Sequence, residues 1–508
     1  MSAVGSILTN AGALQALNAI ANTSNTTNNL ESQLSSGLAI NSPADNPAGF
    51  ITAQGFTSQL NGLTQAISNA NQGVSLLQTA QGAITQQISV VQQLNSIAVQ
   101  AANGTQTPAE AQSLQSVVGQ LTGQVSTIAN QTQFNNISLL NGTFSGVQFQ
   151  VGANEGQTLS LSIANTSASA IGLNASTANA SGIFAFGAAA ANAKAGSAAL
   201  TLGSATKIAA GSGGAFTAGN LTVTGPTGGS ASIKVATTQE SAASLATAIN
   251  NTSGTTGVQA QATTSVTLKL ANAVAGSGFS FKIQAGTGSG GTSGSGIGSV
   301  QTINASSAAQ IVSQINGSTS TSGITASLDS TGDLVLTQAS GQNINITGVT
   351  AGSLSTTGGG ADVVLKTGAG TASGVFQGQV QFQSSAAFSV SNAADIGLNT
   401  SSTLNSLADI NVSTTSGANS AINVVKFALA ALNNQGGQLG AVQQSLTANI
   451  NNLNTTSQNL TSALGVVQDA NIPAVSNQLT EAQIQAQSGV AALKSSTQLQ
   501  QSFLSLLP

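Results

Sequence analysis

An apolar stripe near the C-terminal end of the chain constrains its fold more than any other feature. Large aliphatic side chains recur there at alternating spacings of three and four residues, with Gly436, Gln443 and Ser457 as interruptions. The stripe contains Ile422, Val425, Leu429, Leu432, Leu439, Leu446, Ile450, Leu453, Leu460, Leu464 and Val467. Such a heptad stripe must be buried against other helices, because a single helix cannot cover its own apolar seam.

A second stripe with the same spacing lies near the other end of the chain. Its members are Leu63, Ile67, Ala70, Val74, Leu77, Gln81, Ile84, Ile88, Val91, Asn95 and Ala98. The two stripes predict that both ends of the chain pack against each other within one molecule, with the residues between them looped out. We therefore predict an α+β fold, in which both chain ends form an antiparallel coiled-coil rod that carries a β-hairpin and an outward β-rich insertion.

Charged side chains are scarce, which limits the functions that the chain supports. Only 4% of its 508 residues are charged, and the 8 basic ones are all Lys. No cation precedes Lys194, which argues against nucleic-acid binding by that part of the chain. The chain has no Cys and no His, so it lacks disulfides, thiolate metal sites and the ligands of a metallopeptidase. We expect no metal, no cofactor and no catalysis.

Two further observations concern membranes and export. No stretch of 18 apolar residues is present, so we expect no membrane insertion. The first residues have neither the cationic start nor the long apolar run of a cleaved secretion signal. If the protein leaves the cell, we expect a route that reads no such signal.

Prolines and helix-start signals divide the helical parts of the chain. Pro43 and Pro47 interrupt the N-terminal pattern, and Pro473 interrupts the C-terminal one. The sequence Thr107-Pro108-Ala109-Glu110 is typical of a helix start. We predict helices over about 5–40, 57–103, 107–130 and 402–470, and a last amphipathic helix beyond Pro473.

The residues between the helical parts carry strand signals. Two alternating runs flank the Gly-rich turn 152–156 and predict a β-hairpin: Val147, Phe149 and Val151, then Leu159, Leu161 and Ile163. Further on, Ile249-Asn250 and Ile315-Asn316 lie 66 residues apart in similar surroundings. Each pair ends a short helical pattern that leads into alternating strands. We predict two repeated α+β modules at about 219–285 and 298–350.

Short motifs mark both ends of the chain. The N-terminal motifs are Leu34-Ser35-Ser36-Gly37-Leu38-Ala39-Ile40-Asn41-Ser42, Gly62-Leu63-Thr64-Gln65-Ala66, Asn69-Ala70-Asn71, Ile97-Ala98-Val99-Gln100, Gln131-Thr132-Gln133-Phe134-Asn135 and Gln150-Val151-Gly152-Ala153-Asn154-Glu155-Gly156. The C-terminal motifs are Leu439-Gly440-Ala441-Val442-Gln443, Asn459-Leu460-Thr461-Ser462-Ala463, Asn477-Gln478-Leu479, Ala482-Gln483-Ile484 and Leu504-Ser505-Leu506-Leu507. In order and spacing, these motifs resemble those of bacterial flagellin, the subunit of the flagellar filament.

The resemblance implies a division into segments and a function. It predicts inner coiled-coil segments over 1–42 and 471–508, two parts of a helical rod over 43–175 and 399–470, and a variable outer region over 176–398. It also implies export through the flagellar type III apparatus and polymerisation outside the cell into a filament for swimming. The implied partners are other copies of the chain, an export chaperone, and the filament cap and junction proteins.

The contacts between copies are expected on the terminal helices, because a lone terminal helix cannot bury its stripe and would fold against its neighbours. The candidate contact residues are Leu14, Leu17, Ile20, Leu30, Leu34, Leu38, Val475, Leu479, Ala486, Leu493, Phe503 and Leu507. An ordinary coiled coil within one chain is the alternative for these stripes.

The alternatives to a filament subunit are a hook–filament junction protein, a surface adhesin and an enzyme. A hook–filament junction protein shares the terminal helices, but the long middle region counts against it. A surface adhesin is compatible with the composition. An enzyme would need a Ser/Lys pair that uses Lys194, Lys207 or Lys234, and no spacing supports one. The low charge also predicts a filament that tolerates acid, because acid denaturation acts mainly through carboxylates.

Overall fold

The computed structural model describes residues 10–176, 219–226, 228–235, 241–271, 278–286, 299–356, 364–366, 374–376, 378–391 and 401–504. The chain divides into two compact units. The first comprises 1–79, 144–162 and 438–508, and the second comprises 80–143 and 163–437. Lys194 and Lys207 lie outside the described residues.

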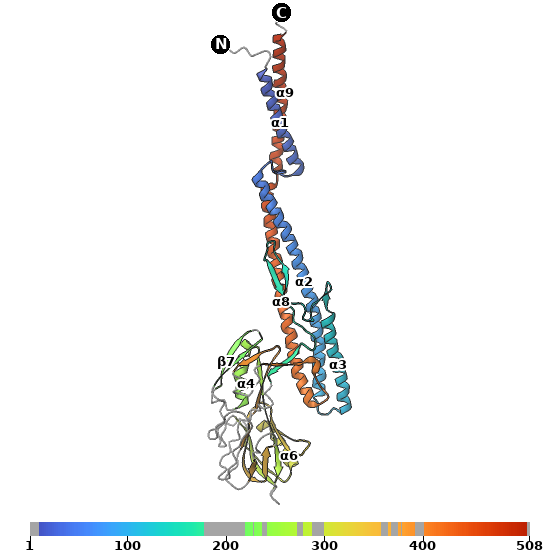
Figure 1. Ribbon diagram of the computed structural model, residues 1–508, viewed down its shortest axis with the longest axis vertical. Coiled ribbons are helices and arrows are strands. Elements are labelled where there is room, and N and C mark those ends of the chain that lie inside the picture. Colours follow the sequence, from blue (N-terminus) through green and yellow to red (C-terminus); the bar gives the residue numbers. More distant parts are fainter. Residues whose placement is uncertain are drawn as a thin grey trace. The chain divides into compact units, whose positions relative to one another are not determined.

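Long helices dominate both ends of the described chain (Figure 1). Their bounds are α1 Ala11–Ser36, α2 Pro47–Ala101, α3 Pro108–Gln131, α8 Thr415–Gln468 and α9 Ile472–Leu504. The prediction of helical ends, a hairpin and a β-rich middle region is confirmed. Four short helices lie in that middle region: α4 Ala242–Asn250, α5 Ser253–Thr256, α6 Ala308–Gly317 and α7 Thr319–Ser322.

Three predicted helix ends were wrong, each for a local reason. Helix α1 ends at Ser36 because Gly37 adopts a left-handed conformation with φ 72° and caps it. Helix α2 begins at Pro47, about ten residues earlier than predicted, because proline fits the first turn of a helix. Helix α8 begins at Thr415 instead of 402, because strand β19 (Thr403–Ser406) and a short 3-10 helix (Leu407–Asp409) precede it.

In the first unit, the start of α2 packs against the second half of α8. Leu63, Ala66 and Leu453 form a buried cluster with Ile67 and Leu460 packed beside it. These residues come from the two predicted stripes. A Cβ on Gly73 would lie 3.2 Å from the Leu446 side chain, so the two helices approach closely there.

The predicted hairpin is confirmed as strands β3 (Val147–Gln150) and β4 (Thr158–Leu161), paired antiparallel with Phe149 opposite Leu159. Its backbone is tied to α2, because the Asn69 side chain donates to the Gln150 carbonyl at 3.2 Å. The hairpin turn lies directly on the helix, where a Cβ on Gly62 would be 2.9 Å from that of Ala153.

In the second unit, the end of α2, the start of α8 and α3 surround an extended segment at 163–168. The fully buried Gln87 of α2 donates to the carbonyls of Val125 on α3 and Thr166 on that segment. The Gln435 side chain of α8 accepts the backbone N–H of Ala164 at 3.3 Å. Amide side chains therefore hold this segment between the helices, as expected where few charges are available.

The rest of the second unit is a set of antiparallel sheets. The largest has the order β11-β12-β8-β17-β5-β19, with β14 also paired to β8 and β15 paired to β14. Smaller sheets have the orders β10-β9-β13-β16, β18-β6-β7 and β1-β2. The remaining strand bounds are β1 Gln133–Phe134, β2 Ile137–Ser138, β5 Gly172–Ser176, β6 Gly219–Thr224, β7 Ser230–Val235, β8 Gln259–Ala271, β9 Phe279–Gly286, β10 Gln301–Ala305, β11 Ile324–Leu328, β12 Leu334–Gln338, β13 Asn343–Ala351, β14 Ser353–Thr356, β15 Val364–Lys366, β16 Gly374–Phe376, β17 Gln379–Ser384 and β18 Ser389–Ser391.

The 66-residue repeat is present in three dimensions. Both copies begin a helix with a serine cap, Ser241 and Ser307, and both turn through a left-handed glycine into the next strand. The Asn250 side chain donates to the Ala260 carbonyl at 2.9 Å and accepts the Ala260 N–H at 2.7 Å. Asn316 makes the same two bonds to Ala326, at 2.8 and 2.7 Å. The repeated asparagine thus clamps each helix to its following strand.

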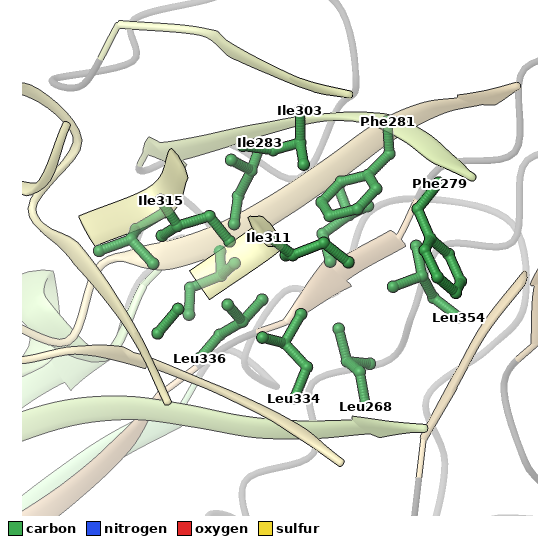
Figure 2. Close-up of a cluster of buried hydrophobic side chains, with 14 of the residues drawn as sticks. Leu268, Phe279, Phe281, Ile283, Ile303, Ile311, Ile315, Leu334, Leu336 and Leu354 are labelled. Atoms are coloured by element: carbon green, nitrogen blue, oxygen red, sulfur yellow. The ribbon is translucent and has the colours of Figure 1, made fainter. Parts of the chain in front are cut away.

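Each module has its own apolar core, and strand β8 contributes to both. Ala260 and Ala262, in its first half, belong to the core around α4, and Leu268, in its second half, belongs to the core around α6. Figure 2 shows this second core, in which Ile311 and Ile315 of α6 point among side chains from β8, β9, β10 and β12.

The residues that form each core do not all come from the sequence range predicted for the corresponding module. Strand β9, which lies inside the expected range 219–285, packs into the second core. The first core is completed by Val380 and Phe382 of β17 and Val390 of β18, far along the chain.

Candidate polymer-contact surface

Helices α1 and α9 of the first unit form a two-stranded seam (Figure 1). On each helix, residues at spacings of three and four are buried or half-buried, and the residues between them are exposed. The seam residues of α1 are Ala13, Ala16, Ile20, Thr23, Thr27, Leu30 and Gln33. Those of α9 are Val475, Leu479, Ala482, Ala486, Gly489, Leu493 and Ser496. This pattern is the heptad of a coiled coil.

The register of the seam is antiparallel. At one end, the Ser496 hydroxyl donates to the Asn10 side chain at 3.1 Å. In the middle, a Cβ on Gly489 would meet Ile20 at 2.9 Å. At the other end, Leu30 is buried with Val475 and Ala482. In the middle of the seam, the large Ile20 thus faces the small Gly489.

The seam ends at a joint where the two chain ends are bonded together. The Ala39 N–H donates to the Gln468 carbonyl at 2.7 Å, and the Ala470 N–H donates to the Gly37 carbonyl at 2.9 Å. Beyond the joint, hydrogen bonds from the backbone of Ser42 and Asn41 hold the pKa of the Asp45 carboxyl below its ordinary value. The turn before α2 is therefore built around an ionised carboxylate.

The structure separates the twelve candidate contact residues into groups. Six belong to the seam within the chain: Ile20, Leu30, Val475, Leu479, Ala486 and Leu493. Leu38 is half-buried at the joint, and Leu34 is 37% exposed. Leu14 and Leu17 lie outside the seam and are 57% and 52% exposed. The side chain of Phe503 and all of Leu507 lie outside the described residues.

Sequence reasoning missed three exposed apolar residues of α9: Ile484, Val490 and Leu499, each more than half exposed. They lie off the heptad stripe of α9 that supplied the candidates on this helix. A search for large apolar residues that lie outside the heptad stripe of a helix would have identified them. Together with Leu14 and Leu17 they make an outer set of apolar side chains on the α1–α9 pair.

The described residues offer little for other kinds of site. They contain no group of three acidic side chains that could hold a metal ion. None of the described helices is both long and apolar enough to cross a bilayer.

Family models match both helical ends and part of the middle region. The bacterial flagellin N-terminal helical region matches 7–145, and the C-terminal helical region matches 422–507. The flagellin hook IN motif matches 280–340, which covers most of the second module from β9 to β12. A B-type flagellin of Pseudomonas aeruginosa is 31% identical over 95% of this chain and 96% of its own length. The chain belongs to the bacterial flagellin family.

Other relatives match a shorter part of this flagellin-family chain. Flagellin B of Vibrio anguillarum is 36% identical over 31% of the chain and 42% of its own length. Among solved structures, FliC from Burkholderia pseudomallei is 19% identical over 74% of the chain and 99% of its own length, with a TM-score of 0.29. The FlgL structure from Xanthomonas campestris is 12% identical over 80% and 98%, with a TM-score of 0.32.

Membership of the flagellin family gives the function of the chain. It is a structural subunit that polymerises with other copies of itself into the extracellular flagellar filament. The helical ends, which carry the family motifs, also carry the α1–α9 pair described above.

Proposed function

We propose that the α1–α9 pair joins neighbouring subunits through the outer set of Leu14, Leu17, Ile484, Val490 and Leu499. The observation that supports this is that each of these five large apolar side chains is more than half exposed on the α1–α9 pair. Burial of each such side chain against a neighbour is worth about 1.5–3 kcal/mol. A few buried residues per contact are enough to drive an interface that repeats along a filament.

The seam residues have an indirect role in this proposal. Ile20, Leu30 and Leu479 hold α1 and α9 together, and the pair then presents its outer faces to other copies. Leu34 lies at the joint end of the pair, and its exposure allows it to contact both α9 of the same chain and a neighbouring copy. The candidate set from the sequence thus divides into residues that build the pair and residues that join pairs.

The test is polymerisation of the purified full chain on filament seeds, followed by electron microscopy and sedimentation. The double variant Leu14→Ser/Leu17→Ser is expected to raise the critical concentration at least tenfold while the helical content of the monomer stays constant. The matched control is Val300→Ser, which removes an equally exposed side chain from the second unit. Equal critical concentrations for both variants would contradict the proposal.

We also propose that the chain reaches the filament through the flagellar type III export apparatus, and that a chaperone covers α9 before export. An exposed apolar set on α9 supports this, because unprotected copies would associate inside the cell. Cap and junction proteins then bind the same terminal helices at the two filament ends. The test is secretion of the chain by a flagellated host with and without its export apparatus. Secretion independent of that apparatus would refute this route.

The composition supports a role without catalysis. The chain has no Cys and no His, so the common nucleophile and base pairs are missing. An adhesin role for the β-rich modules is the second candidate, and no described residue of those modules favours a particular ligand.

A further inference from the structure

The two repeated modules differ at the residue that follows the clamping asparagine. In the second module Asn316 precedes Gly317, whereas in the first module Asn250 precedes Asn251. Packing does not require a glycine at position 317, because a Cβ there would meet no atom within 4 Å. Gly317 is the last residue of α6 and continues the helix. The difference between the modules therefore concerns the chemistry of the asparagine rather than the packing of the helix.

An asparagine followed by glycine can lose its side-chain amide without an enzyme, because glycine has no side chain to hinder its own backbone nitrogen. The Gly317 nitrogen attacks the side-chain carbon Cγ of Asn316, and a Cγ–N bond forms. The proton of that nitrogen passes through water to Nδ2, the Cγ–Nδ2 bond breaks, and ammonia leaves. Water then adds to either carbonyl of the cyclic imide, which opens to aspartate or isoaspartate.

In the folded module, two features keep the reacting atoms of this pair apart. The Asn316 side chain donates to the Ala326 carbonyl at 2.8 Å and accepts the Ala326 N–H at 2.7 Å, so both polar atoms bonded to Cγ are held against β11. The backbone N–H of Gly317 points back along α6, as in any helix. The attack on Cγ therefore requires that the clamp and the end of α6 open first.

Conversion of Asn316 removes the clamp permanently. In aspartate an oxygen replaces Nδ2, so two acceptors face each other where the amide donated to the Ala326 carbonyl. Ala326 is 6% exposed, and its carbonyl is left without that donor. In isoaspartate the main chain also runs through the side-chain carbon, which displaces Gly317 from the end of the helix. Neither product restores the two bonds.

We propose that Asn316–Gly317 is a latent deamidation site, which the closed clamp protects and whose conversion leaves the second module open. The reaction consumes only water, so it proceeds outside the cell without a modifying enzyme. The first module keeps its clamp, because the side chain of Asn251 hinders the same attack on Asn250. Each subunit therefore carries one module that changes with age and one that does not.

The rate of deamidation tests the protection by the clamp. The purified full chain is incubated in mildly alkaline buffer, and each asparagine is followed by mass spectrometry of its peptide. Asn103–Gly104, in the exposed turn between α2 and α3, is the reference within the same chain. Asn316 is expected to react roughly 5–150-fold more slowly than Asn103 in the folded chain, because two hydrogen bonds must break first. In urea the two rates are expected to be similar. Equal rates in the folded chain would overturn the protection.

Two variants separate opening from chemistry. Ser307→Ala removes the cap of α6 and is expected to speed the reaction of Asn316 about 2-fold to 30-fold. Ser241→Ala, which removes the corresponding cap of α4, is the matched control and should leave that rate unchanged. Gly317→Ala is expected to lower the rate in urea to about that of Asn250. If Ser307→Ala has no effect, opening does not control the reaction, and if Gly317→Ala has none, the cyclic route is wrong.

Hydrogen exchange of the aged chain tests the consequence. Molecules converted at Asn316 are expected to lose the protection of the Ala326 amide and to keep that of Ala260, and the variant Asn316→Asp should reproduce this loss. Full protection of Ala326 in the converted molecules would overturn the proposal that conversion leaves the module open.

Discussion

The clamp between Asn316 and Ala326 gives the sharpest prediction about the β-rich modules. The substitution Asn316→Ala removes both hydrogen bonds, of 2.8 and 2.7 Å, that join the end of α6 to strand β11. Ala326 is 6% exposed, so water cannot easily replace the lost side chain. The backbone N–H and carbonyl of Ala326 on that side are left without their partner.

The cost follows from these two groups. A buried donor or acceptor without a partner costs about 1–3 kcal/mol, so two of them cost about 2–6 kcal/mol. The second module should therefore open locally far more often than in the natural chain. Asn250→Ala is the matched variant, because Asn250 makes the same two bonds to Ala260 in the first module.

Hydrogen exchange measures each module separately in the intact protein. In Asn316→Ala the amide of Ala326 is expected to exchange about 30-fold faster or more, while the amide of Ala260 changes less; the reverse holds for Asn250→Ala. Some coupling is expected through β8, which the two cores share. Unchanged protection of Ala326 would refute the assignment of the clamp. Equal loss in both modules would show that they unfold as one unit.

Three further predictions concern other parts of the molecule. Thr107→Ala should destabilise α3 by about 0.5–2 kcal/mol, measured by urea unfolding, because Thr107 and Glu110 cap each other; Thr105→Ala is the control. Hydrogen bonds lower the pKa values of the Asp45, Glu110 and Asp329 carboxyls. The stability that these carboxylates contribute is therefore complete above their ordinary pKa values, and it is lost only as the pH falls through the lowered pKa values. Helical content followed by circular dichroism should thus stay constant down to about pH 4, and a steep loss above pH 5 would contradict this reasoning. In the monomer, hydrogen exchange should become faster along α1 from Leu30 toward Asn10, and filament formation should slow it; uniform protection in the monomer would contradict this.

The sequence predicted the elements whose signals are local and periodic. The heptads of α2 and α8, the hairpin alternation around 152–156 and the serine-capped repeat all depend on side chains close together along the chain. Helix ends were less accurate, because a single residue decides them. Gly37 ends α1, although the apolar stripe continues through Leu38.

Long-range strand pairing was beyond sequence reasoning. Strand β17 pairs with β8 through Phe382 and Ala260, which are more than 120 residues apart, and no local pattern marks that partner. The proposed contact surface includes residues that the sequence prediction did not select, for a related reason. Heptad positions identify what one helix buries, and in α1 and α9 this turned out to be the other helix of the same chain. In the proposed contact, the residues that join different subunits lie off the heptad, as Leu14 and Ile484 do.

The distribution of large side chains along the α1–α9 seam explains how one pair of helices can serve both purposes. The fully buried seam residues, Leu30, Val475 and Ala482, all lie near the joint. Toward the chain ends, the seam is built mostly from small or polar residues, such as Ala13, Gly489 and Ser496, which bury little apolar area. In the proposed contact, the joint end is therefore stable in one subunit, whereas the terminal end gains most of its stability from neighbours that cover Leu14 and Leu17. A stronger seam would fix the pair before assembly, and a weaker one would lose the register that aligns its outer faces.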